Sequence, residues 1–153
     1  MIMKKKFYIP LLILSLLSLN SCSHIKDVNG LENYQLETIT LQDVLNGTNH
    51  IEFMSKSWNS EINGVRSSVL SISKFSGVKE IHSTYLTNES ITYYISNEVY
   101  EGNFAIYIIN NNKVIKTIEA NQEETFTLNE IRGNCILKIA GESANFKMKY
   151  KIS

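Results

Sequence analysis

The strict alternation of residues 146–152 constrains the fold of this chain more than any other feature. Large apolar side chains occupy every second position and lysines lie between them: Phe146, Met148, Tyr150 and Ile152 against Lys147, Lys149 and Lys151. A two-residue period is that of a β-strand with one face turned to a core. Shifting the pairing by one residue would bury three ammonium groups, so the register of this strand is firmly specified.

Earlier parts of the chain repeat this two-residue period. Apolar and polar residues alternate in three further runs, at 70–73, 91–96 and 104–108. Turn signals separate the later runs, namely three asparagines at 110–112 and glycine-containing stretches at 132–134 and 141–143. Asn and Gly adopt the left-handed conformation that hairpin turns require. The pattern predicts an all-β fold, a single antiparallel β-sandwich of about seven to nine strands.

One short helix is expected before the sheet, near residues 41–46. Thr40 followed by Asp43 three residues later is a capping pattern, and apolar residues follow at helical spacing. Gly47 then favours the end of the helix.

Two segments beyond the predicted helix have weaker signals. Residues 50–54 are predicted to form a short strand. The polar stretch 58–64 shows no alternation and is predicted to be a loop that closes on a turn at Asn63 and Gly64.

Basic and apolar residues are segregated at the amino end of the chain. Three lysines at positions 4–6 precede an apolar run at 7–19, which is shorter than the roughly 20 residues of a membrane-spanning helix. Ser21 and Cys22 follow, and with them the segment resembles a bacterial lipoprotein signal. The resemblance implies a diacylglyceryl group on the Cys22 thiol and cleavage just before it. The alternative is an ordinary secretory signal that leaves Cys22 as a free thiol.

This resemblance implies three regions. Residues 1–21 are a cleaved signal peptide, residues 22–35 are the lipidated cysteine with a flexible tether, and residues 36–153 are the β-sandwich domain. Two or more acyl chains anchor a protein stably. The domain is therefore expected outside the cytoplasm, held on the cell membrane by lipid.

Charge argues against nucleic-acid binding, and the cysteine content argues against an intramolecular disulfide. The chain has 15 basic and 15 acidic residues, and loss of the three signal lysines leaves a net charge of −3. Nucleic-acid binding requires a basic excess, so a nucleic-acid partner is not expected. With Cys22 lipidated, Cys135 has no intramolecular partner, and its position at the start of a strand favours a buried, inert thiol.

No set of residues identifies a reaction. Ser71 and Lys74 have the Ser-x-x-Lys spacing of penicillin-recognising enzymes, but alternation places them on opposite faces of a strand. His24, His50 and His82 are isolated from one another, without the close spacing of metal ligands. We therefore predict no enzyme activity, no cofactor and no metal, and a small hydrolase is the least favoured alternative.

Aromatic and basic side chains provide the candidate binding residues. Tyr93 and Tyr94 must point to opposite faces of a strand, so an exposed Tyr94 together with Trp58 could form a platform on which a sugar ring stacks. Packing in the core or at its rim is the competing interpretation. Lys147, Lys149 and Lys151 either solubilise a sheet face or form a basic stripe for anionic lipid or wall polymer.

Structural motifs occur in the second half of the chain at residues 74–77, 101–104 and 132–141. With these motifs the chain resembles the small β-sandwich lipoproteins of low-GC Gram-positive bacteria, most of which have no known function. The resemblance implies a non-enzymatic binding or structural module at the cell envelope, with a glycan, peptide or protein as partner. The alternative is a sequestering or immunity-type lipoprotein that captures a secreted peptide or protein, for example by strand addition at an open sheet edge.

Overall fold

The structure is a computed structural model, and it describes residues 36–153. The predicted signal peptide and tether lie outside the described residues. The elements in chain order are α1 (Leu41–Asn46), β1 (His50–Ile51), β2 (Met54–Ile62), β3 (Val65–Asn110), β4 (Lys113–Glu119) and β5 (Glu123–Ile152). All strand pairings found among these elements are antiparallel. The prediction of a mainly antiparallel β protein with a short helix at 41–46 is confirmed.

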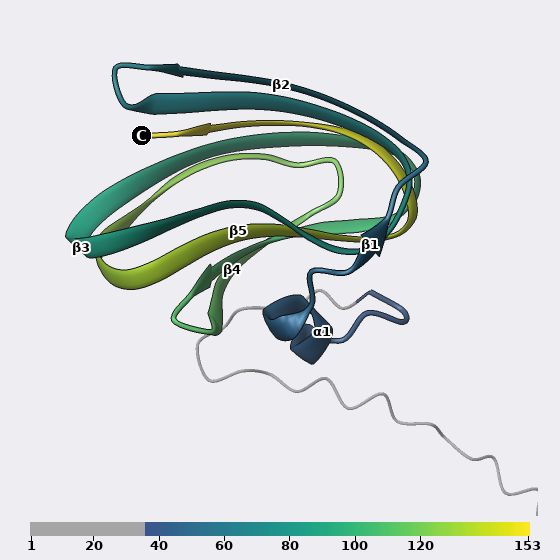
Figure 1. Cartoon of the computed structure of the whole chain (residues 1–153), viewed down its shortest axis with the longest axis horizontal. Helices are drawn as coiled ribbons and strands as arrows, with labels where there is room; N and C mark the ends of the chain where they lie inside the picture. Colours follow the sequence, from purple (N-terminus) through teal and green to yellow (C-terminus); the bar gives the residue numbers. More distant parts are fainter. Residues whose placement is uncertain (1–35) are drawn as a thin grey trace, which may run out of the picture.

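The long strands β3 and β5 bend repeatedly, so that one continuous sheet folds back on itself (Figure 1). Its first half joins β2 to residues 65–73, then 146–152, 91–99 and 123–128. Its second half joins β1 to residues 76–87, then 132–141, 103–110 and β4. Figure 1 shows β2 and the C-terminal strand in the upper part of the molecule and β4 in the lower part.

Left-handed residues mark the bends between the two halves. At one end of the molecule, the backbone φ angle is 51° at Lys74, 109° at Gly77, 75° at Gly102 and 54° at Ser143. Gly102 is required there for a second reason, because a Cβ at this position would lie 2.5 Å from the carbonyl oxygen of Glu142. Such close backbone approach at a positive φ is tolerated by glycine alone among common residues. These four residues act as corners inside very long strands, and of the four only Ser143 belongs to a predicted turn.

The main hydrophobic core lies between the two halves of the sheet. Its members come from every long segment and include Ile72, Phe75, Tyr93, Ile95, Phe104, Ile106, Leu137, Ile139, Phe146 and Met148, each at most 1% exposed. The alternation predicted for residues 146–152 is confirmed, since the apolar residues are buried and the three lysines are exposed. Burial of this apolar surface is the main favourable term in folding.

Helix α1 covers a second, smaller cluster on the outer face of the second half. Val44 is 1% exposed and packs with Leu36, Val78, Tyr107 and Ala140. The predicted capping pattern is present: the Thr40 amide donates to the Asp43 carboxylate at 2.9 Å, and the Asp43 amide donates to the Thr40 hydroxyl at 3.2 Å. None of the helices in the described part of the chain is long and apolar enough to cross a membrane.

Lys138 holds the other end of α1 against the sheet. Its side chain is 3% exposed, and its ammonium group donates to the carbonyl oxygens of Val44, Leu45 and Gly47 at 3.0, 2.9 and 3.1 Å. Carbonyls at a helix C-terminus have no partners within the helix. A cation there satisfies them and also interacts favourably with the helix dipole.

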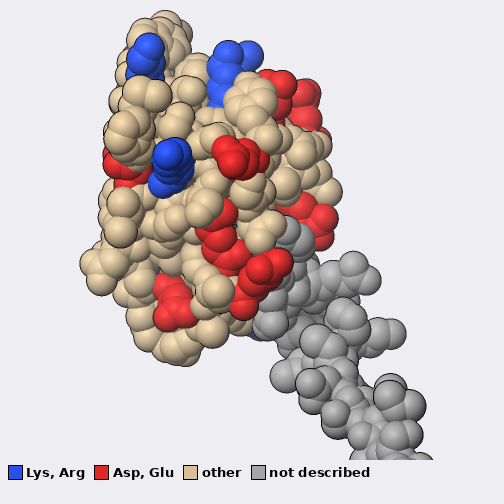
Figure 2. Space-filling model, turned by 90° about the vertical axis from the view of Figure 1, so that its right-hand side faces the viewer, with Lys and Arg blue, Asp and Glu red and all other residues tan. Residues whose placement is uncertain are grey.

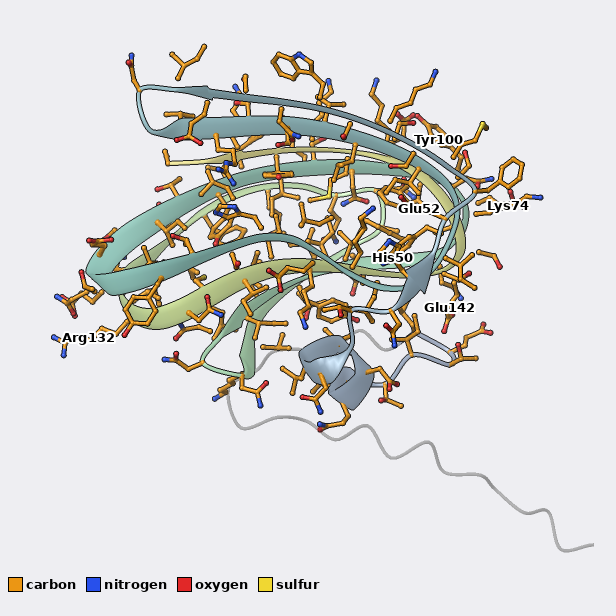
Figure 3. All side chains as sticks on the ribbon, in the orientation of Figure 1. His50, Glu52, Lys74, Tyr100, Arg132 and Glu142 are labelled. Atoms are coloured by element: carbon orange, nitrogen blue, oxygen red, sulfur yellow. The ribbon has the colours of Figure 1, made fainter. Side chains whose placement is uncertain are left out.

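Glu142 ties the first described residues to a bend of the sheet. Its carboxylate accepts hydrogen bonds from the amides of Glu37 and Ile39 at 3.1 Å each, from the Thr38 amide and hydroxyl at 2.5 and 2.7 Å, and from Asn103 Nδ2 at 3.0 Å. Partial burial alone would raise its pKa, but the hydrogen bonds from Asn103, Thr38 and Ile39 outweigh this and lower the pKa of Glu142 to about 2. Figure 3 shows Glu142 at the same end of the molecule as His50.

This depressed pKa predicts loss of stability in acid. The carboxyl group of Glu142 has a pKa of about 2 when folded and about 4.5 when unfolded, so its contribution is complete above pH 4.5 and disappears as the pH falls towards 2. After discounting for solvent screening, we expect a contribution of about 1–2 kcal/mol. Denaturant unfolding of the parent and Glu142→Gln proteins from pH 7 to pH 3 tests it. The difference in unfolding free energy should shrink in acid; a constant difference would contradict the assignment.

The prediction of a loop at residues 58–64 is wrong. Residues up to Ile62 belong to β2, which pairs with β3 from Ile62 opposite Val65 to Met54 opposite Ser73. The turn at Asn63 and Gly64 was correctly placed, with φ angles of 52° and 75°. Alternation fails here because almost every side chain of β2 is exposed, on both faces of the strand. Backbone pairing with β3 creates this strand, and backbone pairing leaves no mark on side-chain polarity.

Candidate binding site

A surface groove of about 330 Å³ lies on the outer face of the first half of the sheet. It is lined by Trp58, Ser67, Ser68, Val69, Tyr94, Lys149, Tyr150 and Lys151. Four of these, Trp58, Tyr94, Lys149 and Lys151, are residues that the sequence singled out. The structure therefore brings the predicted aromatic platform and two lysines of the predicted basic stripe into one site.

Strand register explains how the groove is formed. Trp58 lies opposite Val69, and Val69 lies opposite Lys149, so these three side chains form one row on one face. In the neighbouring row, Lys151 lies between Ser67 and Tyr94. The small Ser67 and Val69 side chains form a low floor along β3. Larger side chains stand on the strands at either side, which leaves a groove along the floor.

The two aromatic residues present their rings differently. Trp58 is 60% exposed on the edge strand β2, whereas Tyr94 is half-buried. The Lys151 ammonium group lies 5.9 Å from the centre of the Tyr94 ring. Reduced solvation and the neighbouring Glu123 carboxylate raise the pKa of Tyr94, so its hydroxyl stays protonated at neutral pH. Tyr93 points to the opposite face and is 0% exposed, as the two-residue period requires.

Lysines give the groove a positive charge. Lys149 and Lys151 are exposed, and neither takes part in any ion pair found among the described residues. Lys147 is exposed on the same face, but it lies opposite Ser71 and Glu98 and does not line the groove. Glu123 is the acidic neighbour of Tyr94, and Figure 2 shows several other acidic side chains at the end of the molecule where the sheet bends.

The groove combines stacking surface, hydroxyl groups and positive charge. Its volume lies at the small end of the range for ligand sites, about 300–1,000 Å³. Ring faces such as that of Trp58 pack against flat apolar surfaces, hydroxyls accept and donate hydrogen bonds, and ammonium groups attract anions. These contacts suit a sugar unit that carries or adjoins a negative charge.

Of the predictions for the two cysteines, the structure tests only the one for Cys135. Cys22, the predicted lipidation site, lies outside the described residues. Cys135 is 0% exposed, which confirms its predicted burial, and its sulfur lies 3.3 Å from the Tyr93 hydroxyl oxygen. Burial raises the pKa of the Cys135 thiol, although the Tyr93 hydroxyl bond opposes this shift. A protonated, enclosed thiol is a poor nucleophile.

Sequence reasoning missed a polar cluster at an edge between the two halves. A hollow of about 340 Å³ is lined there by residues that include Glu61, Arg66 and Tyr150. Arg66 pairs with Glu61 at 3.1 Å and donates to His82 Nδ1 at 2.8 Å. Burial and the Arg66 charge lower the pKa of His82. Arg66 lies just after a turn and His82 lies 16 residues further on, so sequence spacing gave no sign of the contact.

The third hollow is shallow and lies beside the Glu142 hydrogen bonds. Its volume is about 540 Å³, and its lining includes Thr38, His50, Gly77 and Glu142. The Glu142 oxygens are already occupied by donors of the chain, so this hollow offers a ligand little. Within residues 36–153, no three His, Cys, Asp or Glu side chains are grouped as a metal site would require.

Comparison with known proteins identifies no family for the chain. No protein-family model matches it, and no curated protein matches it either. A solved structure of Bacillus endospore appendages, described as disulfide-linked pili, matches with a TM-score of 0.40 and 12% identity over 67% of this chain and 85% of that one.

Two Drosophila melanogaster structures also match. CENP-C bound to CAL1 has a TM-score of 0.27 and 8% identity, covering 61% of this chain and 79% of that one. The CENP-C cupin domain has a TM-score of 0.26 and 12% identity, covering 71% of this chain and 90% of that one. Similarity at these levels supports no argument about the function of this chain.

Proposed function

We propose that this chain is a lipid-anchored lipoprotein whose β-sandwich domain binds a ligand at the cell envelope and catalyses no reaction. The observation that carries the proposal is the groove, where Trp58 and Tyr94 lie with Lys149 and Lys151 although they come from three separate stretches of sequence. Exposed aromatic and basic side chains around a hollow are typical of binding surfaces.

The sandwich architecture is supported by where the core lies. Apolar side chains from both halves of the sheet meet in one cluster, for example Ile95 and Phe146 from the first half and Ile106 and Leu137 from the second. Two packed sheets enclosing alternate residues of their strands is the arrangement of a β-sandwich. In this architecture, the outer face that carries the groove remains free for a ligand.

The proposed ligand is an anionic carbohydrate chain of the envelope. Trp58 stacks on a sugar ring, and the two lysines attract acidic groups along the chain. Because the lysines lie on one strand two residues apart, their ammonium groups are spaced at about 7 Å along it. An elongated ligand with repeated negative charges fits this spacing better than a compact neutral one.

Capture from an envelope extract tests the binding site. We expect the full-length chain, purified in mild detergent and immobilised, to retain an acidic glycan, and the Trp58→Ala, Tyr94→Ala double variant to lose it. With the captured material, the double substitution should raise Kd at least tenfold, which corresponds to about 1.4 kcal/mol. Lys149→Gln with Lys151→Gln should weaken binding and flatten its dependence on salt.

Matched variants outside the groove control this experiment. Tyr85 and Tyr100 are 73% and 62% exposed and do not line the groove, so their double substitution by alanine should leave capture intact. Lys147→Gln is the control for the two lysine substitutions, because Lys147 does not line the groove, and it should also leave capture intact. Equal loss in the Tyr85 and Tyr100 variant, or capture of nothing by the parent chain, would contradict the proposal.

Membrane attachment has a separate test. Replacing Cys22 by Ala removes the acceptor of the proposed lipid. We expect the parent chain in the membrane fraction, released by detergent, with a mass that includes the acyl groups. Since a diacylated protein stays on the bilayer and an unmodified one does not, the Cys22→Ala chain should leave that fraction. Membrane association that survives this substitution and still yields to detergent would refute the lipid anchor.

A further inference from the structure

The strand β2 is an open edge of the sheet. Among the described residues it pairs only with β3, and Figure 1 shows it as the outermost ribbon of the upper part of the molecule. Ile62 and Val65 flank a two-residue turn, and residues in that position exchange hydrogen bonds with each other. Alternation along the strand then directs the backbone groups of Ser55, Ser57 and Asn59 away from β3. These N–H and C=O groups are available to another strand.

This edge has few of the features that protect an edge strand. It is nine residues long, contains no proline, and its charged residues are Lys56 and Glu61. Met54, Trp58 and Ile62 are four residues apart, so they share one face, and they are 58%, 60% and 68% exposed. Natural sheets usually shorten, charge or cover such edges because they otherwise pair with other chains.

The sequence of β2 is complementary to itself about Trp58. If two copies of the strand run antiparallel with Trp58 opposite Trp58, Met54 of one copy lies opposite Ile62 of the other. Lys56 then lies opposite Ser60, so no two lysines meet. Glu61 lies opposite Ser55, so the carboxylates are also separated. This pattern favours a second copy of the chain over an unrelated strand as the occupant.

We infer that two copies of this protein associate by pairing their β2 strands in this register. The two sheets become one continuous sheet with a two-fold axis at Trp58, perpendicular to its plane. Both outer faces lie on the same side, because side chains directly opposite each other share a face. The two grooves therefore lie next to each other, with a Trp58 ring of each copy at the centre, and together they form a longer surface.

A proline substitution tests the pairing without disturbing the rest of the fold. Ser57→Pro removes an N–H that points away from β3, so the β2–β3 hydrogen bonds remain, and edge strands tolerate proline. Sedimentation velocity of the full-length chain in detergent measures the dimerisation. We expect a monomer–dimer equilibrium for the parent chain, and a dimer dissociation constant at least tenfold higher for Ser57→Pro. Ser57→Thr, which keeps the N–H, should dimerise like the parent. Circular dichroism verifies that each variant is folded.

Cysteine cross-linking tests the register independently of the proline variant. In a Cys22→Ala background, Trp58→Cys should form a disulfide-linked dimer under mild oxidation, because residues opposite each other lie within disulfide reach. Ser60→Cys should not, since two copies of residue 60 would be four positions apart, about 13 Å. Cys135 is buried and does not interfere. Two results would overturn the inference: a parent chain that stays monomeric at every concentration, or equal cross-linking at positions 58 and 60. If β2 pairs only with a foreign peptide, the parent chain will stay monomeric.

Discussion

Replacing Phe146 by alanine is expected to lower the free energy of unfolding by about 3–5 kcal/mol. The Phe146 side chain is 1% exposed, and its ring centre lies 4.1 Å from that of Phe104 and 5.9 Å from that of Phe75. All three lie near the bends where strands pass between the two halves of the sheet. The truncation removes ring contacts and leaves a cavity that the surrounding strands, fixed by their pairing, cannot fill.

Urea unfolding followed by Trp58 fluorescence and by far-ultraviolet circular dichroism measures this effect. Phe146→Leu, which retains most of the volume, should cost clearly less than the alanine substitution. Phe53→Ala provides a matched surface control, because Phe53 is 74% exposed, and it should change stability by less than about 1 kcal/mol. A loss below about 1 kcal/mol for Phe146→Ala would be inconsistent with a packed core at this corner.

Lys138→Met is expected to cost about 2–4 kcal/mol and to release α1 from the sheet. The substitution keeps an apolar stem of similar length but leaves the carbonyl oxygens of Val44, Leu45 and Gly47 without the donor they now share. Buried acceptors without partners are costly. A six-residue helix is not stable by itself, so loss of this attachment exposes the cluster around Val44.

Amide hydrogen exchange distinguishes loss of the helix from general destabilisation. Exchange at residues 42–47 should accelerate in Lys138→Met well before exchange in the strands around Phe146. Lys113→Met is the matched control, because Lys113 is exposed at the start of β4, and its stability and exchange should resemble those of the parent. Unchanged protection of the helix in Lys138→Met would show that the ammonium group is not what holds it.

The sequence predicted secondary structure correctly wherever one face of an element is buried and the other is exposed to solvent. The C-terminal strand is the best case, since Met148 is buried while its neighbours Lys147 and Lys149 are exposed. The helix was found through its own capping residues, Thr40 and Asp43, which act over a distance of three residues. Signals of this kind are local, so they survive without knowledge of the rest of the chain.

The sequence misled where no such contrast exists. β2 is exposed on both faces, so its residues look like a loop, and its identity as a strand depends on its partner in β3. The merging of several predicted strands into β3 and β5 has a different cause. Residues such as Lys74 and Gly102 adopt turn-like φ angles there, but the ladder continues through the bends with shifts in register.

For the candidate site too, the sequence predicted some features and the structure was needed for others. Exposed aromatic and basic residues were singled out by type. The two-residue period gave the face that Tyr94 and the three lysines occupy, but not that of Trp58, which was expected in a loop. The sequence suggested Trp58 and Tyr94 as partners only because both were expected to be exposed aromatic residues. Their place in one groove depends on the sheet, since 36 positions separate them and residues 65–73 and 146–152 lie between them. The buried Lys138 could have been suspected from its place in the apolar run 135–140, but its acceptors could not.

The sequence by itself therefore determined that this chain forms antiparallel strands, which face of the last strand is buried, and where the short helix lies. These properties follow from side-chain polarity and local hydrogen bonding, whose effects span a few residues. Only the tertiary structure decided which strands are neighbours, that Glu142 and Lys138 hold distant backbone groups, and that an aromatic and basic groove lies beside an open edge. Such contacts depend on backbone hydrogen bonds, which are the same for every residue and so leave strand order unspecified by any single stretch of sequence.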